Sequence, residues 1–90
     1  MKFEWNETKA RKNFLKHEVL FTEAQTVFDD LLYIDLYDAD HSKAEDRYIA
    51  VGVSLQGRLL IVLYTERAQS IRIISARTAT SYERRAYEEG

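Results

Sequence analysis

Residues 47–76 contain three apolar segments separated by short turns, a pattern that leaves few folds open to the chain. RYIAVGVSL and RLLIVLYTE are joined through SLQGR, where Gly57 suits a positive φ, so they are predicted to form a β-hairpin. SIRIISA follows the ERAQ turn and extends the pattern to a meander of antiparallel strands near 47–54, 59–66 and 70–76. RLLIVLYTE is apolar on both faces, which is typical of a central strand covered on both sides.

The N-terminal segment predicts a short strand and a helix. FEW has the period-two spacing of a strand, and Asn6 directly after it is a suitable N-cap for a helix near 6–17. Ala10, Phe14 and His17 recur on one face of that helix, which is therefore expected to pack on the sheet.

Two further helices and one further strand are predicted around the meander. Thr22 is expected to cap a helix near 22–29, and Thr78 or Thr80 to cap a closing helix near 79–88. Between the second helix and the meander, LYIDLYD alternates apolar and polar residues as a strand does. The predicted order is β-α-α-β-β-β-β-α in a single domain over residues 1–90. The fold class is α+β, an antiparallel β-sheet meander packed by helices.

Composition narrows the class of protein. The chain has 90 residues and no cysteine, which excludes disulfides and thiolate metal sites. No apolar run approaches the ~20 residues of a membrane helix, and MKFEWNETK lacks the apolar core of a signal peptide. We therefore expect a soluble protein of the cytoplasm that has no contact with membranes.

Charge is segregated along the chain although the net charge is only −2. Residues 28–46 carry seven acids against one lysine, a balance of −6, whereas residues 65–86 carry five arginines against two glutamates, a balance of +3. Residues 1–20 carry five cations against three glutamates, a balance of +2. Local fields of this kind are compatible with an anionic partner.

The sequence offers no convincing metal or phosphate-loop motif. Its two histidines, His17 and His41, lack carboxylates at a known ligand spacing. The acids around His41 could hold a cation, but a solvated acidic loop is the simpler interpretation. His17 ends an amphipathic helix, so it could interact with the helix dipole, or serve as a proton-transfer group that titrates near neutral pH.

Arginines along the last apolar segment allow two interpretations. Arg72 interrupts a run of isoleucines, and Arg77 follows just beyond it. Both could pair with acids such as Glu66 or Glu83, or both could form a phosphate-binding face, since guanidinium offers planar bidentate donors. Aromatic residues that could stack on bases are better explained as core residues; they are Trp5, Tyr48 and Tyr64.

Four segments in order resemble one protein family over nearly the whole chain. FEWNETKARKNFLKHEVLFTEAQTVFDD, DADHSKAEDRYIAVG, GRLLIVLYTER and RIISARTATSYERRAYEE together resemble the BrnT-type toxins of bacterial type II toxin–antitoxin systems. One position departs from the family: Glu18 stands where a glycine usually follows the Lys-His pair. A glycine there would act as a helix C-cap, so the turn into the second helix is expected to differ.

The resemblance implies a RelE-like fold and a ribonuclease that cleaves RNA without a metal or other cofactor and arrests translation. It also implies a cognate antitoxin similar to BrnA, with a ribbon-helix-helix region, in a two-plus-two heterotetramer. Promoter DNA would be bound only through the antitoxin. A second possibility is a non-catalytic or degenerate module whose role is to pair with the antitoxin.

Residue roles follow from the chemistry of such cleavage, in which a ribose 2′-hydroxyl attacks the adjacent phosphorus. This step needs proton transfer and cations that stabilise growing negative charge. Arginine stays protonated at neutral pH and therefore cannot accept a proton. Charge stabilisation is assigned to Arg47, Arg72 and Arg77, and proton transfer to His17. RNA contacts are assigned to Lys9, Lys16, Arg67 and Trp5.

Overall fold

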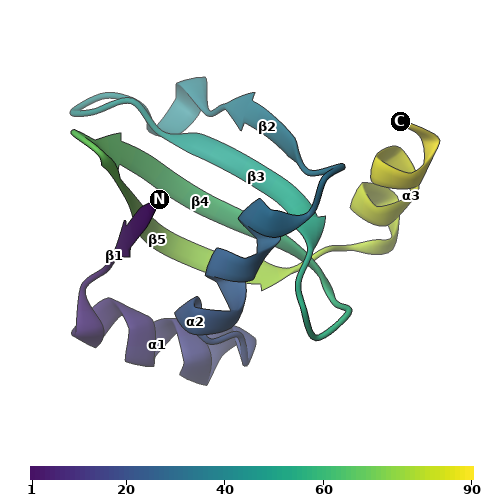
Figure 1. The fold of residues 1–90 in the computed structure, drawn as a ribbon, viewed down its shortest axis with the longest axis horizontal. Helices are drawn as coiled ribbons and strands as arrows, with labels where there is room; N and C mark the ends of the chain where they lie inside the picture. The colour runs from purple at the N-terminus through teal and green to yellow at the C-terminus, as the bar shows by residue number, and fades with distance from the viewer.

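The computed structural model describes all residues from 1 to 90 (Figure 1). Its elements follow the predicted order, but the helix predicted near 22–29 is divided into a short α-helix and a 3₁₀ helix, and one further 3₁₀ helix is added. They are β1 (Lys2–Glu4), α1 (Glu7–His17), α2 (Phe21–Ala24), η1 (Gln25–Asp29), β2 (Ile34–Tyr37), η2 (Ala39–His41), β3 (Tyr48–Val53), β4 (Leu59–Arg67), β5 (Ser70–Thr78) and α3 (Ser81–Glu89).

A five-stranded sheet forms the centre of the molecule, in the order β1-β5-β4-β3-β2. The pairs β2–β3, β3–β4 and β4–β5 are antiparallel, which confirms the predicted meander and the α+β class. β1 joins the outside of β5 in parallel, with Phe3 opposite Ile71, so the sheet as a whole is mixed rather than purely antiparallel. The sequence patterns identify strands but do not show which neighbour a terminal strand takes.

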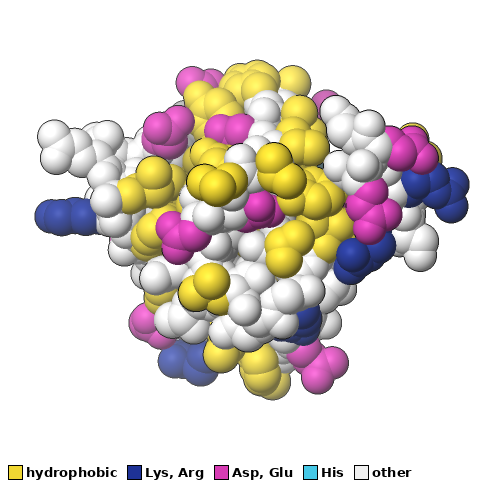
Figure 2. All heavy atoms as spheres, turned by 45° about the vertical axis from the view of Figure 1, so that its right-hand side comes forward, with side chains coloured by type: hydrophobic (Ala, Val, Ile, Leu, Met, Phe, Trp, Pro, Cys, Tyr) yellow, Lys and Arg dark blue, Asp and Glu magenta, His cyan; other side chains and the backbone are white.

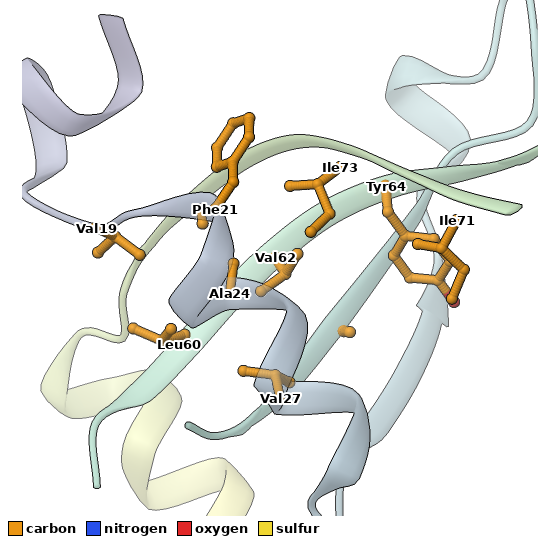
Figure 3. Close-up of a cluster of buried hydrophobic side chains, with 11 residues drawn as sticks. Val19, Phe21, Ala24, Val27, Leu60, Val62, Tyr64, Ile71 and Ile73 are labelled. Carbon is orange, nitrogen blue, oxygen red and sulfur yellow. The ribbon is translucent and has the colours of Figure 1, made fainter. Parts of the chain in front are cut away.

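One face of the sheet is covered by α1, α2 and η1, and the hydrophobic core lies between them (Figures 1 and 3). Alternate residues of β4 point into this core, so Leu60 and Val62 are fully buried and Tyr64 is nearly so. Ile61 and Leu63 point to the other face and are only half-buried. The prediction that this strand is covered on both sides is therefore correct for one face and only partly so for the other.

We name that second side the open face and define it by the β4 and β5 residues Ile61, Leu63, Thr65, Arg72, Ser75 and Arg77. α3 covers one end of it. Residues of α3 and of the sheet line a shared groove of about 250 Å³, which includes Ile61 and Tyr87. Most of the β5 half of the open face has no helix over it (Figure 1).

Helix ends follow the sequence patterns in two cases out of three. Asn6 caps α1 by accepting a 3.0 Å hydrogen bond from the Lys9 amide, and Thr80 caps α3 in a complete capping box with Glu83. The predicted cap at Thr22 is wrong, because α2 begins at Phe21 with Leu20 as a cap that makes no side-chain hydrogen bond. Burial explains the shift: starting the helix at Phe21 places its ring in the core at 2% exposure.

Glu18 adopts the left-handed conformation that a glycine would favour, with φ 56° and ψ 37°. Its amide donates a 2.8 Å hydrogen bond to the Phe14 carbonyl, as the C-cap of α1. The turn is therefore built as a glycine would build it, at a strain cost of roughly 1–2 kcal/mol for a non-glycine residue.

Candidate nucleic-acid interface

A register shift in β5 brings Arg72 and Arg77 to the same face of the sheet. They are five positions apart in the sequence, so in a regular strand they would point to opposite faces. Leu63 pairs with Ser75 but Tyr64 pairs with Ile73, which leaves Ile74 as an extra residue on β5. Consequently Arg72 lies opposite Thr65 and Arg77 opposite Ile61, both on the open face.

Four residues form one row across the open face, which we name the arginine row: Arg47 directly before β3, Thr65 on β4, Arg72 on β5 and Glu4 on β1. The strand registers pair Thr65 with Arg72 and Arg72 with Glu4. Continuing the β3–β4 register by one residue places Arg47 beside Thr65, whose hydroxyl donates a 2.6 Å hydrogen bond to the neighbouring Asp46 carbonyl. At the usual strand spacing, the backbones of Arg47 and Arg72 lie about 10 Å apart. The structure thus brings these two predicted site residues together.

Carboxylates engage both β5 arginines. Arg72 Nη1 donates to Glu4 Oε2 at 3.1 Å, and its side chain is 25% exposed. Arg77 donates from Nη1 and Nη2 to the two oxygens of Glu83, both at 2.8 Å, and from Nη1 to the Thr78 carbonyl at 3.3 Å. These bonds lower the pKa of Glu83 to about 2 and raise the pKa of Arg77. Pairing with Glu83, one of the two alternatives for Arg77, is therefore present, whereas Glu66 pairs with neither arginine.

The two guanidinium groups differ in how many donors they leave for a ligand. Each guanidinium carries five N–H donors. Arg72 uses one of them, on Glu4, whereas Arg77 uses three. Arg72 is therefore held by one carboxylate while most of its donors remain available, and Arg77 is chiefly committed to α3.

Arg47 and Arg67 are held less firmly at their guanidinium groups. The Arg47 backbone is anchored, since its amide donates to Ser42 Oγ at 2.8 Å and its carbonyl accepts from the Asp38 amide at 2.8 Å. Its guanidinium makes no hydrogen bond or ion pair. Arg67, at the end of β4, donates to Glu45 at 3.3 Å and is half exposed.

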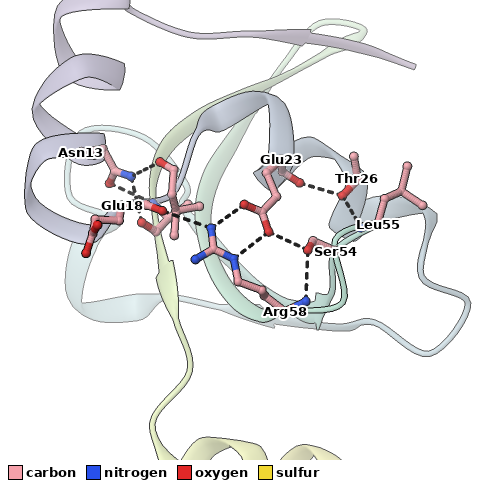
Figure 4. A network of polar contacts seen from close by, with 9 residues as sticks. Asn13, Glu18, Glu23, Thr26, Ser54, Leu55 and Arg58 are labelled. Atoms are coloured by element: carbon pink, nitrogen blue, oxygen red, sulfur yellow. Dashed lines mark hydrogen bonds and ion pairs between the residues drawn. The ribbon is translucent and has the colours of Figure 1, made fainter.

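α1 is fixed to the free edge of β5 by a residue that the sequence patterns did not indicate. The Asn13 amide group donates to the Ala76 carbonyl at 2.8 Å and accepts from the Ala76 amide at 3.1 Å, as a neighbouring strand would (Figure 4). It also donates to the Val19 carbonyl at 3.1 Å and is 7% exposed. An asparagine within the buried stripe of an amphipathic helix is the signal that could have identified it, because buried amides are hydrogen-bonded.

The four N-terminal site residues differ in their surroundings. Lys9 and Lys16 stand at i−4 and i+3 from Asn13 on α1, are exposed, and do not line the groove between α1 and α2. His17 stands at i+4 from Asn13 and is half-buried without a hydrogen-bond partner. The Trp5 indole donates to Glu7 at 3.0 Å and packs edge-on against Phe21. The structure does not bring His17 or Trp5 onto the arginine row.

Tyr48 and Tyr64 belong to the core side of the sheet. Tyr64 is 3% exposed and donates to Asp35 at 2.6 Å, and Tyr48 stacks on it with ring centroids 5.6 Å apart. The core interpretation of these two aromatic residues is therefore confirmed.

A partly buried ion pair away from the open face was not predicted from the sequence. Glu23 is 7% exposed and accepts from the Arg58 Nε and Nη2 groups and from Ser54 Oγ (Figure 4). Hydrogen bonds from Arg58 are the main cause of the lowered pKa of Glu23. Arg58 Nη2 also donates to the Glu18 carbonyl at 3.1 Å, so this network joins α1, α2 and the β3–β4 turn. Its role is structural.

Neither a metal-binding cluster nor a membrane-spanning helix is found in the folded chain. No group of three or more histidine, cysteine, aspartate or glutamate side chains is arranged to hold a metal ion. No helix is both long and apolar enough to cross a membrane.

Comparison with known proteins shows the family of the chain and a related fold. Residues 5–83 match the family described as "Ribonuclease toxin, BrnT, of type II toxin-antitoxin system", so the chain belongs to the BrnT family of ribonuclease toxins. The fold is similar to the crystal structure at 1.1 Å of the Brucella abortus ribonuclease toxin BrnT, with a TM-score of 0.67. The two sequences are 24% identical, and the match covers 90% of this chain and 99% of that one. No curated protein matches the chain by sequence.

Proposed function

We propose that the chain is an endoribonuclease that binds the RNA backbone along the open face and cleaves it without a metal ion. The observation that carries the proposal is the bulge at Ile74, which places Arg72 and Arg77 on one face with Arg47 in the same row as Arg72. Rigid strand-borne guanidinium groups are well suited to stabilise charge on phosphoryl oxygens. As a toxin of this family, the chain would arrest translation in the cytoplasm by this cleavage.

Arg72 and Arg47 are assigned the leading roles in charge stabilisation. Arg72 is oriented by one bond to Glu4 and keeps four of its five donors for a phosphate. Arg47 has its whole guanidinium available. Arg77 would contact RNA with its remaining donors, or with all of them if a phosphate displaced Glu83. Arg67, Lys9 and Lys16 would extend the cationic surface at its margins.

Proton transfer is assigned to His17, the histidine nearest to the β5 edge. Its half-buried position at the end of α1 means that the RNA must pass from the open face around this edge to reach it. Lys16, next to it in the chain, would then hold a flanking phosphate. Trp5 lies in a groove between α1 and α2, and its proposed contact is with a base that follows the same path.

A toxin of a type II system is paired with an antitoxin. We propose that this partner resembles BrnA, carries a ribbon-helix-helix region and forms a two-plus-two heterotetramer that binds promoter DNA through the antitoxin. Occlusion of the open face would be the simplest way to neutralise the toxin, since opposite charge speeds the encounter.

One observation favours a non-catalytic module as the second candidate. Arg67, Arg72 and Arg77 all have carboxylate partners in the folded chain. If these ion pairs were the only purpose of the arginines, the chain would bind its antitoxin without cleaving RNA.

The deciding experiment measures RNA cleavage and melting temperature on the same purified variants. Arg72→Ala is expected to cut the cleavage rate by about 10²–10³ with little change in melting temperature. Arg72→Lys should restore only part of the rate, because a point charge lacks the guanidinium fork. Arg84→Ala, which removes an exposed α3 arginine, is the matched control and should stay active. EDTA should leave the rate unchanged.

The non-catalytic candidate gives another result. In that case the wild-type chain would cleave RNA no faster than the Arg47→Ala, Arg72→Ala double variant, which sets the background rate. Arg72→Ala would then change the melting temperature but not the cleavage rate. A rate that EDTA abolishes would overturn metal independence but not the role of the arginines.

A further inference from the structure

The sheet has one uncovered edge, formed by the four residues of β2. β2 is the last strand in the sheet order, and Figure 1 shows no element beyond it. The opposite edge offers less backbone for pairing. β1 is only three residues long, and farther along β5 the Asn13 side chain already hydrogen-bonds to the Ala76 amide and carbonyl. An uncovered edge presents backbone groups to which another strand can pair.

The pairing of β2 with β3 shows which backbone groups are available. The Asp38 amide donates to the Arg47 carbonyl at 2.8 Å, so Asp38 is turned toward β3. In an antiparallel pair this orientation alternates. Ile34 and Leu36 are therefore also turned toward β3, and the backbone N–H and C=O groups of Asp35 and Tyr37 point outward.

One side of this edge is apolar. Ile34 and Leu36 lie on the open-face side and line the 250 Å³ groove together with Tyr82 of α3. Leu36 is 51% exposed and Tyr82 79% exposed, and the two leucines that precede β2, Leu31 and Leu32, are 98% and 75% exposed. Figure 2 shows hydrophobic side chains spread over the face in view, with acidic groups among them and most Lys and Arg side chains toward its margin.

The other side of the edge is acidic and aromatic. Asp35 and Tyr37 lie there, and the Tyr37 hydroxyl donates to Asp46 at 3.0 Å. The segment 28–46 that contains β2 has the balance of −6 (seven acids against one lysine). Burial and the carboxylates of Asp46 and Glu66 raise the pKa of Tyr48, as expected in a negative local potential.

We propose that the β2 edge binds a β-strand from a partner protein in which apolar and basic residues alternate. The apolar side chains would enter the groove beside Leu36 and Tyr82, and the basic side chains would lie beside Asp35 and Asp46. Strand addition gives affinity through backbone hydrogen bonds and specificity through alternate side chains. The β2 edge does not include the arginine row, although Arg77 lines the same groove as Leu36 and Tyr82. The inference rests on the β2 backbone and on charge, not on ribonuclease activity.

A second copy of this chain fits the edge poorly. Pairing two β2 strands would bring two Asp35 carboxylates and two segments of −6 charge together, and like charges on adjacent strands are destabilising. Charge therefore selects a basic partner strand over self-association.

Titration of the full-length, ¹⁵N-labelled chain with synthetic peptides tests the proposal. The probe is a peptide of alternating valine and lysine, and its matched control alternates valine and glutamate. The first should give saturable amide shifts centred on residues 34–37. The second should bind about tenfold or more weakly, since its charges repel the edge.

Backbone methylation distinguishes strand addition from general charge attraction. In a paired strand, alternate N–H groups face the edge. Methylating the amides of only the valines, or of only the lysines, should therefore abolish binding in one of the two peptides and spare it in the other. Leu36→Lys should also weaken binding about tenfold, whereas Leu15→Lys, at a leucine 83% exposed on α1, should not.

Several results would overturn the proposal. One is equal binding of the lysine and glutamate peptides, and another is equal loss or retention of binding in both methylated peptides. A third is saturable shifts centred in the α1–α2 groove instead of on β2. A dimer of the chain alone that Leu36→Lys dissociates would assign the edge to a second copy.

Discussion

Arg77 on β5 holds Glu83 on α3 through two parallel hydrogen bonds, each 2.8 Å long. Glu83 also accepts from the Thr80 amide at 2.9 Å in the capping box of α3. One carboxylate therefore closes the helix N-terminus and ties the helix to the sheet. No residue of α3 is fully buried, and a second polar contact, the 2.7 Å bond from Tyr87 to Asp30, also joins the helix to the rest of the fold.

The first prediction concerns this contact. Arg77→Ala is expected to lower the free energy of unfolding by about 1 kcal/mol, because the ion pair is bidentate but its arginine is 39% exposed and screened by solvent. Amides of residues 81–89 should lose protection from hydrogen exchange before the sheet does. Arg72→Ala is the comparison and should leave α3 protected. Unchanged exchange in Arg77→Ala would mean that the helix is held mainly by its apolar contacts.

The second prediction is a pH dependence. The pKa of Glu83 is lowered from 4.5 to about 2. The unfolded chain therefore takes up a proton at this group at higher pH than the folded chain does. The stabilisation is fully present above pH 4.5 and is lost as the pH falls from about 4.5 to about 2.

Glu83→Gln tests this linkage by difference. The melting temperature of the wild type should exceed that of the variant at pH 7, and the gap should close as the pH approaches 2. Glu88→Gln removes an exposed carboxylate 3.9 Å from Arg84 on the same helix and serves as the control. A gap between wild type and Glu83→Gln that stays constant across this range would contradict the lowered pKa.

Local sequence patterns were sufficient for the strands and for most of the helices. The meander follows from apolar segments and a glycine turn, and Gly57 has φ 86° as that turn requires. Asn6 and Thr80 cap their helices as predicted, because a cap depends only on residues two or three positions away. Thr22 does not cap its helix, because burying the side chain of the preceding residue, Phe21, stabilises the fold more than one capping hydrogen bond would.

Contacts between distant residues were beyond such patterns. The spacing of Arg72 and Arg77 predicts opposite faces, and only the extra residue in β5 reverses this. The bonds from Asn13 to Ala76 span 63 residues, and the pair of Glu23 with Arg58 spans 35. Periodicity does not show which residue an element meets, and in α1 it also misplaced the buried face: Phe14 is 42% exposed, whereas Asn13 is buried. The arginines were therefore predictable as candidates, whereas their common row was not.

The third prediction concerns packing beneath β3. A Cβ atom added at Gly52 would lie 2.9 Å from Val27 Cγ1 and 2.9 Å from Tyr33 Cβ. Neither atom is the end of a flexible side chain, so η1 or the loop after it must move. Gly52→Ala is expected to destabilise the fold by about 1–3 kcal/mol in chemical denaturation. Ala50→Gly, at the next core-facing position of β3, separates the effect of added volume from that of altered strand propensity.

The last prediction uses Glu4 to separate the two roles of Arg72. Glu4 is the carboxylate that a phosphate must compete with, since its Oε2 accepts from Arg72 Nη1 at 3.1 Å. Glu4→Gln keeps the shape of the side chain but removes its charge. If Arg72 binds phosphate, this variant should bind a non-cleavable RNA several-fold more tightly at low salt, because a negative charge beside the site has been removed.

The free energy of unfolding of Glu4→Gln should change by no more than about 1 kcal/mol, as for other partly exposed ion pairs. Glu88→Gln, which removes an exposed carboxylate of α3, is the matched control and should change RNA affinity less. Weaker binding by Glu4→Gln would mean that Glu4 orients Arg72 more than it competes with RNA. Unchanged binding in both Glu4→Gln and Arg72→Ala would remove Arg72 from the RNA site altogether.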